Sequence, residues 1–220
     1  MYKIKDLLDL DHTIAKDYLN KFEYPYEALS GIKEEILRLI QTLNKDEYIE
    51  RSENVWVHKT AKIFDSAYID GPTIICKDAE VRQCAFIRGS VIVGENSVVG
   101  NSCEVKNAII FDNAEVPHFN YVGDSLIGFH GHMGAGSITS NLRADKANVI
   151  CKDGDEKLET GLRKMGAIIG DYAEIGCNAV LNPGVIVARK AMVYPTACVR
   201  GTVPEKTIYK NDGIIEKKEG

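Results

Sequence analysis

One histidine stands next to a proline and directly ahead of a run of polar residues. His118 follows Pro117 in the segment EVPHFNYVGDS. Imidazole titrates near neutral pH, so a histidine can accept a proton as a general base. A histidine beside a proline can also be a plain turn residue. His118 is therefore a candidate for catalysis, with this structural alternative open.

Two cations and a short glycine motif could serve the same chemistry. The guanidinium of Arg88 could hold a phosphate through two hydrogen bonds, and the ammonium of Lys106 could add a point charge. Either residue could equally be a solvated surface charge. The sequence Gly134-Ala135-Gly136 offers a narrow backbone surface, and its amides could bind an oxyanion. The same glycines also suit a corner between strands.

These residues lie in a chain whose aliphatic residues recur every six positions. Ile and Val are in excess, at 24 and 17 against 13 Leu, which disfavours a mostly helical protein. Stepping by six gives Ile, Val or Leu at every position of two ladders: Val57, Ile63, Ile69, Ile75, Val81, Ile87, Val93, Val99 and Val105, then Ile169, Ile175, Leu181, Val187, Val193 and Val199. Mostly small residues follow four positions after each rung. This repeat predicts a left-handed parallel β-helix, in which three repeats form a coil and coils lie about 4.8 Å apart.

The ladder is interrupted twice. Its register slips after Val105, where Pro117 and His118 lie, and the next rungs are taken as Tyr121, Ile127 and Met133. It then vanishes over residues 140–165, a polar segment in which Asp153-Gly154 predicts a hairpin turn. Long loops on a repetitive scaffold are often functional. We expect this loop to reach a neighbouring subunit and help to cover the site.

The first 48 residues do not share the repeat. The spacing of Ile32, Ile36 and Ile40 predicts an amphipathic helix from Ile32 to Leu43, and a second helix is expected from about Leu7 to Phe22. We therefore predict a helical cap (1–48), a β-helix domain (49–205) with an inserted loop (140–165), and a C-terminal tail (206–220).

The composition excludes several classes of function. A net charge of -5 gives no basic excess for nucleic acid or an anionic membrane. No apolar run approaches the length of a membrane span, and the N-terminus is unlike a signal peptide. The six cysteines form no C-x-x-C pair, which suits a cytoplasmic protein and argues against structural zinc.

The blocks P-H-x-N-Y-x-G-D and G-A-G-x-I-x-x-N give the chain a specific resemblance to a known family. It resembles the acetyltransferase half of bacterial bifunctional glucosamine-1-phosphate acetyltransferase/N-acetylglucosamine-1-phosphate uridylyltransferase, and archaeal sugar-1-phosphate transferases with the same half. The likeness covers roughly residues 70–205. No nucleotidyltransferase half and no G-x-G-T-R motif are present.

The resemblance implies an acetyl-CoA-dependent N-acetyltransferase that acts on an amino-sugar 1-phosphate. It implies that His118 is the general base, that Arg88 and Lys106 bind the sugar phosphate, and that Tyr121 and Asn141 shape the sugar site. Tyr121 could instead be a buried rung. His132 stands where the bifunctional enzyme has an asparagine that contacts the sugar. Further residues fall on or near coenzyme A positions: Ala135, Gly136, Cys177, Pro195 and Arg200. Enzymes of this fold are typically homotrimers, so a trimer is expected.

Two alternatives remain at this stage. The missing nucleotidyltransferase half suggests a different function, that of a non-catalytic β-helix subunit that partners a separate nucleotidyltransferase. The second alternative is a zinc enzyme of the gamma-carbonic-anhydrase type, suggested by three histidines, His118, His130 and His132. The H-x-H spacing is, however, absent from that family's pattern. No metal ligand is assigned.

Overall fold

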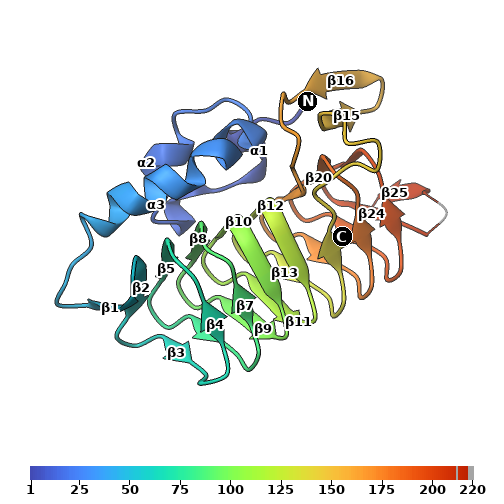
Figure 1. The fold of residues 1–220 in the computed structure, drawn as a ribbon. Coiled ribbons are helices and arrows are strands. Elements are labelled where there is room, and N and C mark those ends of the chain that lie inside the picture. Colours follow the sequence, from blue (N-terminus) through green and yellow to red (C-terminus); the bar gives the residue numbers. More distant parts are fainter. Residues whose placement is uncertain (212, 218–220) are drawn as a thin grey trace.

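The repeat folds into a parallel β-helix of triangular section. The structure is a computed structural model and describes residues 1–211 and 213–217 (Figure 1). Each short strand pairs in parallel with its counterpart one coil further on, as in the register Val57, Ile75, Val93. The predicted mainly β fold, a parallel β-helix with an N-terminal helical cap, is confirmed.

The strands form three flat faces, which we call the first, second and third. The first face contains β2 (Val55–His58), β5 (Thr73–Ile75), β8 (Val91–Val93), the end of β10 (Glu104–Ile110), the end of β12 (Tyr121–Ile127), β17 (Ala167–Ile169), β20 (Val185–Val187) and β23 (Thr202–Val203). The second contains β3 (Lys62–Ile63), β6 (Glu80–Val81), β9 (Val98–Asn101), β11 (Glu115–His118), β13 (His132–Met133), β18 (Glu174–Ile175), β21 (Met192–Val193) and β24 (Thr207–Tyr209). The third contains β4 (Tyr68–Ile69), β7 (Phe86–Ile87), the starts of β10 and β12, β14 (Ile138–Thr139), β19 (Val180–Leu181) and β22 (Cys198–Val199).

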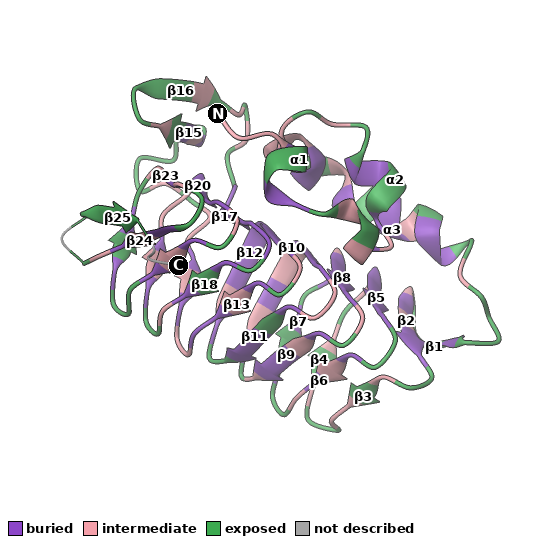
Figure 2. Ribbon diagram, turned by 180° about the vertical axis from the view of Figure 1, so that it is seen from behind, coloured by how far each residue is buried: buried purple, intermediate pink, exposed green. Residues whose placement is uncertain are grey.

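The predicted ladder fills the interior of this prism. Beyond the first coil, rungs such as Ile87, Val105 and Leu181 are completely buried, and the small residues between them are buried too. Figure 2 shows the buried colouring on first-face strands such as β5 and β8. Stiff β-branched side chains suit a flat pleated wall, which accounts for the excess of Ile and Val.

The slip in the ladder is a shortened step in two consecutive coils. Between Val105 and Ile110, and between Val122 and Ile127, the rungs are five residues apart instead of six, within the unbroken strands β10 and β12. The inner rung is therefore Val122, which is completely buried, and the alternative of Tyr121 as a rung is wrong. Tyr121 points outward because neighbouring residues of a strand face opposite sides.

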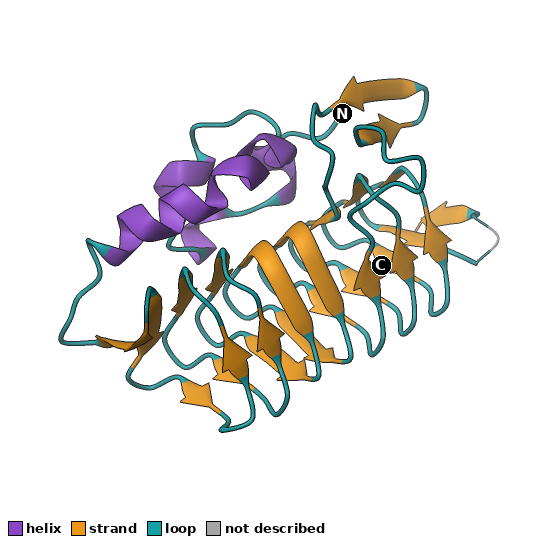
Figure 3. Ribbon diagram, viewed as in Figure 1, coloured by secondary structure: helices purple, strands orange, loops and turns teal. Residues whose placement is uncertain are grey.

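The first face has a second apolar surface on its outside. Its outward residues include Ile74, Ile92, Ile109, Leu126, Ile168 and Ile186, all buried. The helical cap covers this surface, with α3 (Ile32–Ile40) packed against β5, β8 and β10. Figure 3 shows the helices gathered along one side of the prism. This apolar row therefore explains where the cap binds.

The rest of the cap is more broken than expected. In place of one helix from Leu7 to Phe22 there are α1 (Ile4–Leu7), η1 (Leu10–His12) and α2 (Lys16–Leu19), followed by η2 (Pro25–Gly31). Polar contacts made by Asp9 and Thr13 to nearby backbone amides accompany the breaks. The predicted helix from Ile32 does form, but it ends at Ile40.

The inserted loop forms the expected hairpin, of β15 (Ile150–Asp153) and β16 (Glu156–Glu159), paired antiparallel. Val149, Cys151 and Met165 are buried in the apolar cluster that also holds the cap. The loop thus packs on its own chain. At the ends, β1 (Tyr48–Ser52) pairs antiparallel with β2, and β25 (Ile215–Lys217) with β24. The β-helix continues to Tyr209, past the predicted boundary at residue 205.

Candidate active site

Four of the predicted site residues form one row along an edge of the prism. We call the edge between the second and third faces the His118 edge. Backbone hydrogen bonds connect successive coils here: Gly136 N donates to His118 O at 2.9 Å, Asn178 N to Ala135 O at 2.8 Å and Thr196 N to Cys177 O at 2.8 Å. The row therefore runs through His118, Ala135, Cys177 and Pro195, with coils about 4.8 Å apart.

His118 ends β11 and presents an exposed side chain on this edge. Its backbone is held on both sides, because its amide donates to Asn120 Oδ1 at 3.0 Å and its carbonyl accepts from Gly136. Within residues 1–211 and 213–217, no side chain or backbone group hydrogen-bonds its imidazole. The ring is thus free to meet a ligand.

Asn120 positions this histidine and was missed by the sequence analysis. It is 2% exposed, and its Nδ2 donates to Gly134 O at 2.8 Å and Ser137 O at 3.0 Å. It occupies an inward position that other coils fill with small residues such as Cys103. A polar amide at a small-residue position of the ladder was the available signal.

The next strand carries Tyr121 on the outer surface of the third face. Its hydroxyl accepts a hydrogen bond from Asn141 Nδ2 at 3.1 Å. Burial, followed by the nearby Asp124 carboxylate, raises the pKa of Tyr121, which keeps it a neutral phenol. The structure thus brings together Tyr121 and Asn141, the two residues expected at the sugar site.

Asp124 joins this pair to the predicted phosphate cations. It accepts hydrogen bonds from Asn141 Nδ2 and from Asn107 Nδ2, the latter at 3.0 Å, and lies 3.3 Å from Lys106 Nζ. Gly123 leaves the space for this arrangement, since a Cβ there would lie 2.6 Å from the Tyr121 hydroxyl. Asn107, Gly123 and Asp124 were not predicted as site residues, although Gly123 and Asp124 lie in the recognised block.

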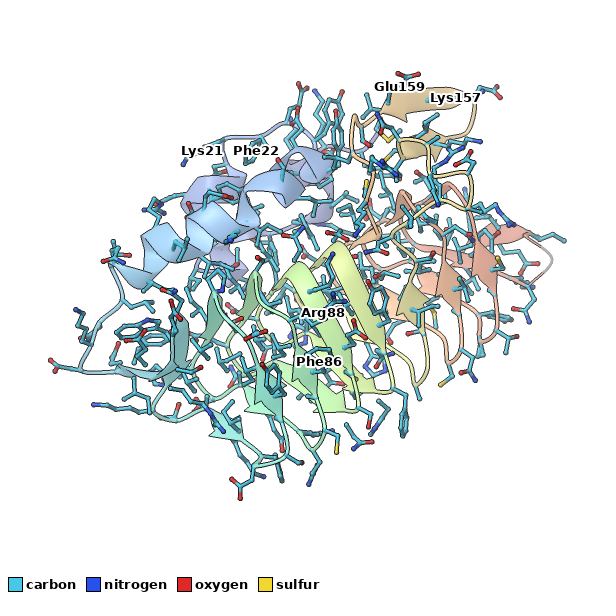
Figure 4. The ribbon with its side chains drawn as sticks, in the orientation of Figure 1. Lys21, Phe22, Phe86, Arg88, Lys157 and Glu159 are labelled. Carbon is cyan, nitrogen blue, oxygen red and sulfur yellow. The ribbon has the colours of Figure 1, made fainter. Side chains whose placement is uncertain are left out.

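Arg88 and Lys106 lie side by side in consecutive coils at the end of the third face. Arg88 Nη1 lies 2.7 Å from Glu104 Oε1, and this carboxylate raises the pKa of Arg88. Figure 4 shows Arg88 beyond Phe86, toward the helical cap. Both cations line a pocket of about 330 Å³, and residues of the cap line its other side. The predicted phosphate pair therefore shares one pocket.

The predicted cofactor residues divide between two edges. Ala135, Cys177 and Pro195 lie on the His118 edge, and Gly136 has a φ of 73°, where a Cβ would lie 2.2 Å from Asn178 Oδ1. Arg200 instead lies across the third face, in a pocket of about 480 Å³ beside the inserted loop. The expected oxyanion role does not hold for the amides of Gly134 and Gly136, because both donate to the backbone of adjacent coils.

The other histidines lie elsewhere. His132 is on the second face, with Nδ1 3.0 Å from Glu115 Oε2, so one subunit does not bring it to Tyr121 and Asn141. His130 stacks on Tyr172 at the edge between the first and second faces, with ring centroids 5.2 Å apart. Among the described residues, no group of three or more His, Cys, Asp or Glu is placed to hold a metal ion.

Comparisons with known proteins agree with the blocks that carry the resemblance. A family model described as the GMPPB C-terminal domain matches residues 69–156. The Bifunctional protein GlmU of Methanococcus maripaludis (strain C5) is 32% identical over 92% of this chain and 50% of its own length. A bifunctional sugar-1-phosphate nucleotidylyltransferase/acetyltransferase of Sulfurisphaera tokodaii is 33% identical over 71% of this chain and 43% of its own.

A similar solved structure is that of the polySia specific acetyltransferase NeuO, which is 16% identical and covers 76% of this chain and 78% of that chain, with a TM-score of 0.48. No helix in residues 1–211 or 213–217 is long and apolar enough to cross a membrane. The chain spans about half the length of the curated relatives it matches. It is a homologue of bifunctional GlmU and sugar-1-phosphate nucleotidylyltransferase/acetyltransferase proteins over their C-terminal, acetyltransferase-like half.

Proposed function

We propose that this protein transfers an acetyl group from acetyl-CoA to the amine of an amino-sugar 1-phosphate. The observation that carries the proposal is the exposed, unpartnered imidazole of His118, set in a row with Ala135, Cys177 and Pro195. The adjacent third face carries Tyr121 and its polar network. The names of the relatives, which include an acetyltransferase activity, support the same reaction class.

In the proposed reaction the amine nitrogen attacks the thioester carbonyl while His118 removes a proton from that nitrogen. A tetrahedral oxyanion forms, the C–S bond then breaks, and the thiolate leaves with a proton from the imidazolium. The products are the N-acetyl sugar phosphate and coenzyme A. General base catalysis of this kind contributes about 10²- to 10⁴-fold to the rate.

The remaining residues bind the two substrates in this proposal. Arg88 and Lys106 take the sugar phosphate, and Tyr121 and Asn141 contact the sugar. The narrow backbone at Ala135 and Gly136, continued by Cys177 and Pro195, lies along the pantetheine arm. Arg200 faces the phosphates of coenzyme A. His132 contacts the sugar only from a second subunit of a homotrimer, because it lies on another face.

The test measures acetyl transfer from acetyl-CoA to glucosamine 1-phosphate and to galactosamine 1-phosphate. The free thiol of coenzyme A that is released provides the readout. We expect turnover with at least one acceptor and a loss of about 10²- to 10⁴-fold in kcat for His118→Ala. His130→Asn is the matched control, since asparagine tolerates its positive φ of 53°. A wild-type protein inert toward both acceptors, with no binding of coenzyme A, would contradict the proposal.

A further inference from the structure

The pocket around Arg88 and Lys106 has a wall that does not belong to the β-helix. Besides those cations it is lined by Gly89, Ser90, Asn107 and Asp124, and on the other side by Ser30, Lys33 and Glu34 of the cap. Ser30 lies near the end of η2, and Lys33 is the second residue of α3. The pocket therefore lies between two parts of the chain that are far apart in sequence.

Contacts between the cap and the β-helix hold the two walls of this pocket in place. Asn107, at the shortened step of β10, donates from Nδ2 to the carbonyl oxygen of Leu29 at 3.1 Å, and from the same atom to Asp124. Ile32 and Ile36 of α3 are completely buried in the apolar cluster that includes the outer row of the first face. The start of α3 is thus fastened beside the two cations.

The charges in the pocket give Lys33 a distinct position. Arg88 is paired with Glu104, and Lys106 with Asp124. Lys33 forms no ion pair with any residue in the described ranges 1–211 and 213–217. Its long, flexible stem lets its ammonium move to an anion in the pocket. It is the cation of this pocket whose charge is not already matched by a carboxylate.

We propose that Lys33 is a third phosphate-binding residue, through which the helical cap contributes to binding of the acceptor substrate. The bound group is a phosphate monoester seated between Lys33 on the cap and Arg88 and Lys106 on the β-helix, with the Ser30 hydroxyl as a further donor. The proposal rests on the proposed function for the identity of the acceptor. The phosphate site itself can be tested without turnover.

The first test measures binding of inorganic phosphate by isothermal titration calorimetry at low ionic strength, without acetyl-CoA. We expect Lys33→Gln to weaken binding about fivefold and Lys33→Glu to weaken it further. Glu34→Gln should act in the opposite direction and strengthen binding, because it removes a negative charge from the same wall. Lys45→Gln is the matched control, since it removes the same charge from the cap outside the pocket and should leave binding unchanged.

The second test uses the kinetics of the wild-type protein and the same variants. Lys33→Gln should raise KM for the amino-sugar 1-phosphate about fivefold and leave KM for acetyl-CoA unchanged. Equal phosphate binding and equal KM in Lys33→Gln and Lys45→Gln would overturn the role of Lys33, whether or not acetyl transfer occurs. Phosphate binding that depends on Lys33 in a protein without acetyltransferase activity would support the site and overturn the proposed function alone.

Discussion

The hydroxyl of Tyr121 and the side-chain amide of Asn141 are joined by a 3.1 Å hydrogen bond that crosses from one coil of the β-helix to the next. The bond depends on the outward direction of Tyr121, whose neighbour Val122 is the inward rung. Asp124 and Lys106 extend the same network toward Arg88. A change at any of these residues should therefore affect KM for the acceptor more than KM for acetyl-CoA.

Removing the Tyr121 hydroxyl tests this network. Tyr121→Phe should raise KM for the acceptor about 5- to 20-fold, because a hydrogen bond to substrate and the partner of Asn141 are lost together. KM for acetyl-CoA should stay within a factor of two. Tyr172→Phe, at an exposed tyrosine on another edge, is the control and should leave both constants unchanged. An equal rise in both KM values for Tyr121→Phe would contradict a role in acceptor binding.

Asn120→Ala should damage both stability and catalysis. The change removes the Asn120 donor from the buried carbonyl of Ser137 and the Asn120 acceptor from the amide of His118, which should cost about 2–4 kcal/mol in the free energy of unfolding. It should also lower kcat, because His118 loses one of its two backbone anchors. Chemical denaturation and steady-state kinetics measure the two effects. The exposed bond from Asn101 to Gln83 O provides a control, in which Asn101→Ala should cost less than about 0.5 kcal/mol.

Asp112 should make the stability depend on pH. Burial raises its pKa from 3.8 to about 6, so the folded protein holds the proton more tightly than the unfolded chain. This contribution to stability is fully present below about pH 4 and is lost as the pH rises through about 6. Asp112→Asn, which keeps an oxygen for Glu95 N, should therefore raise the free energy of unfolding at pH 7.5 by about 1–2 kcal/mol, allowing for partial exposure.

The gain from Asp112→Asn should disappear between pH 6 and pH 4. Denaturant midpoints measured at pH 4.5 and pH 7.5 give the comparison. Asp65→Asn, an exposed position, provides the matched removal of charge. A gain for Asp112→Asn that is the same at both pH values would show that ionisation of the carboxyl is not its cause.

Ile109→Ala should loosen the cap. Ile109 is completely buried between the first face and the cap, and truncation of such a side chain costs about 2–4 kcal/mol. Trp56, the single tryptophan, packs against the same cluster, so its fluorescence should report the change during denaturation. Ile49→Ala, at an exposed isoleucine, should have little effect. An unchanged Trp56 transition in Ile109→Ala would contradict docking of the cap at this row.

The six-residue ladder was readable from the sequence because every rung obeys the same steric rule. The shortened steps were not, since a step of five moves the inner position from Tyr121 to Val122 without changing the character of the segment. The outer row was also present in the sequence, as three consecutive apolar residues in strands such as Val91–Val93. The place of Lys33 beside Arg88 could not be inferred, because it depends on how the cap docks.

The outer row of the first face also determines how the molecule should unfold. In a bare solenoid each coil touches only its neighbours, so the stack can unravel from an end. Here α3 contacts β5, β8 and β10 together. The inserted loop, through Val149, Cys151 and Met165, packs in the same apolar cluster as Ile168 and Ile186 of later coils. The cap thus holds several coils together. We expect it to couple their unfolding, so that the coils bearing Arg88, Lys106 and His118 unfold in a single cooperative transition.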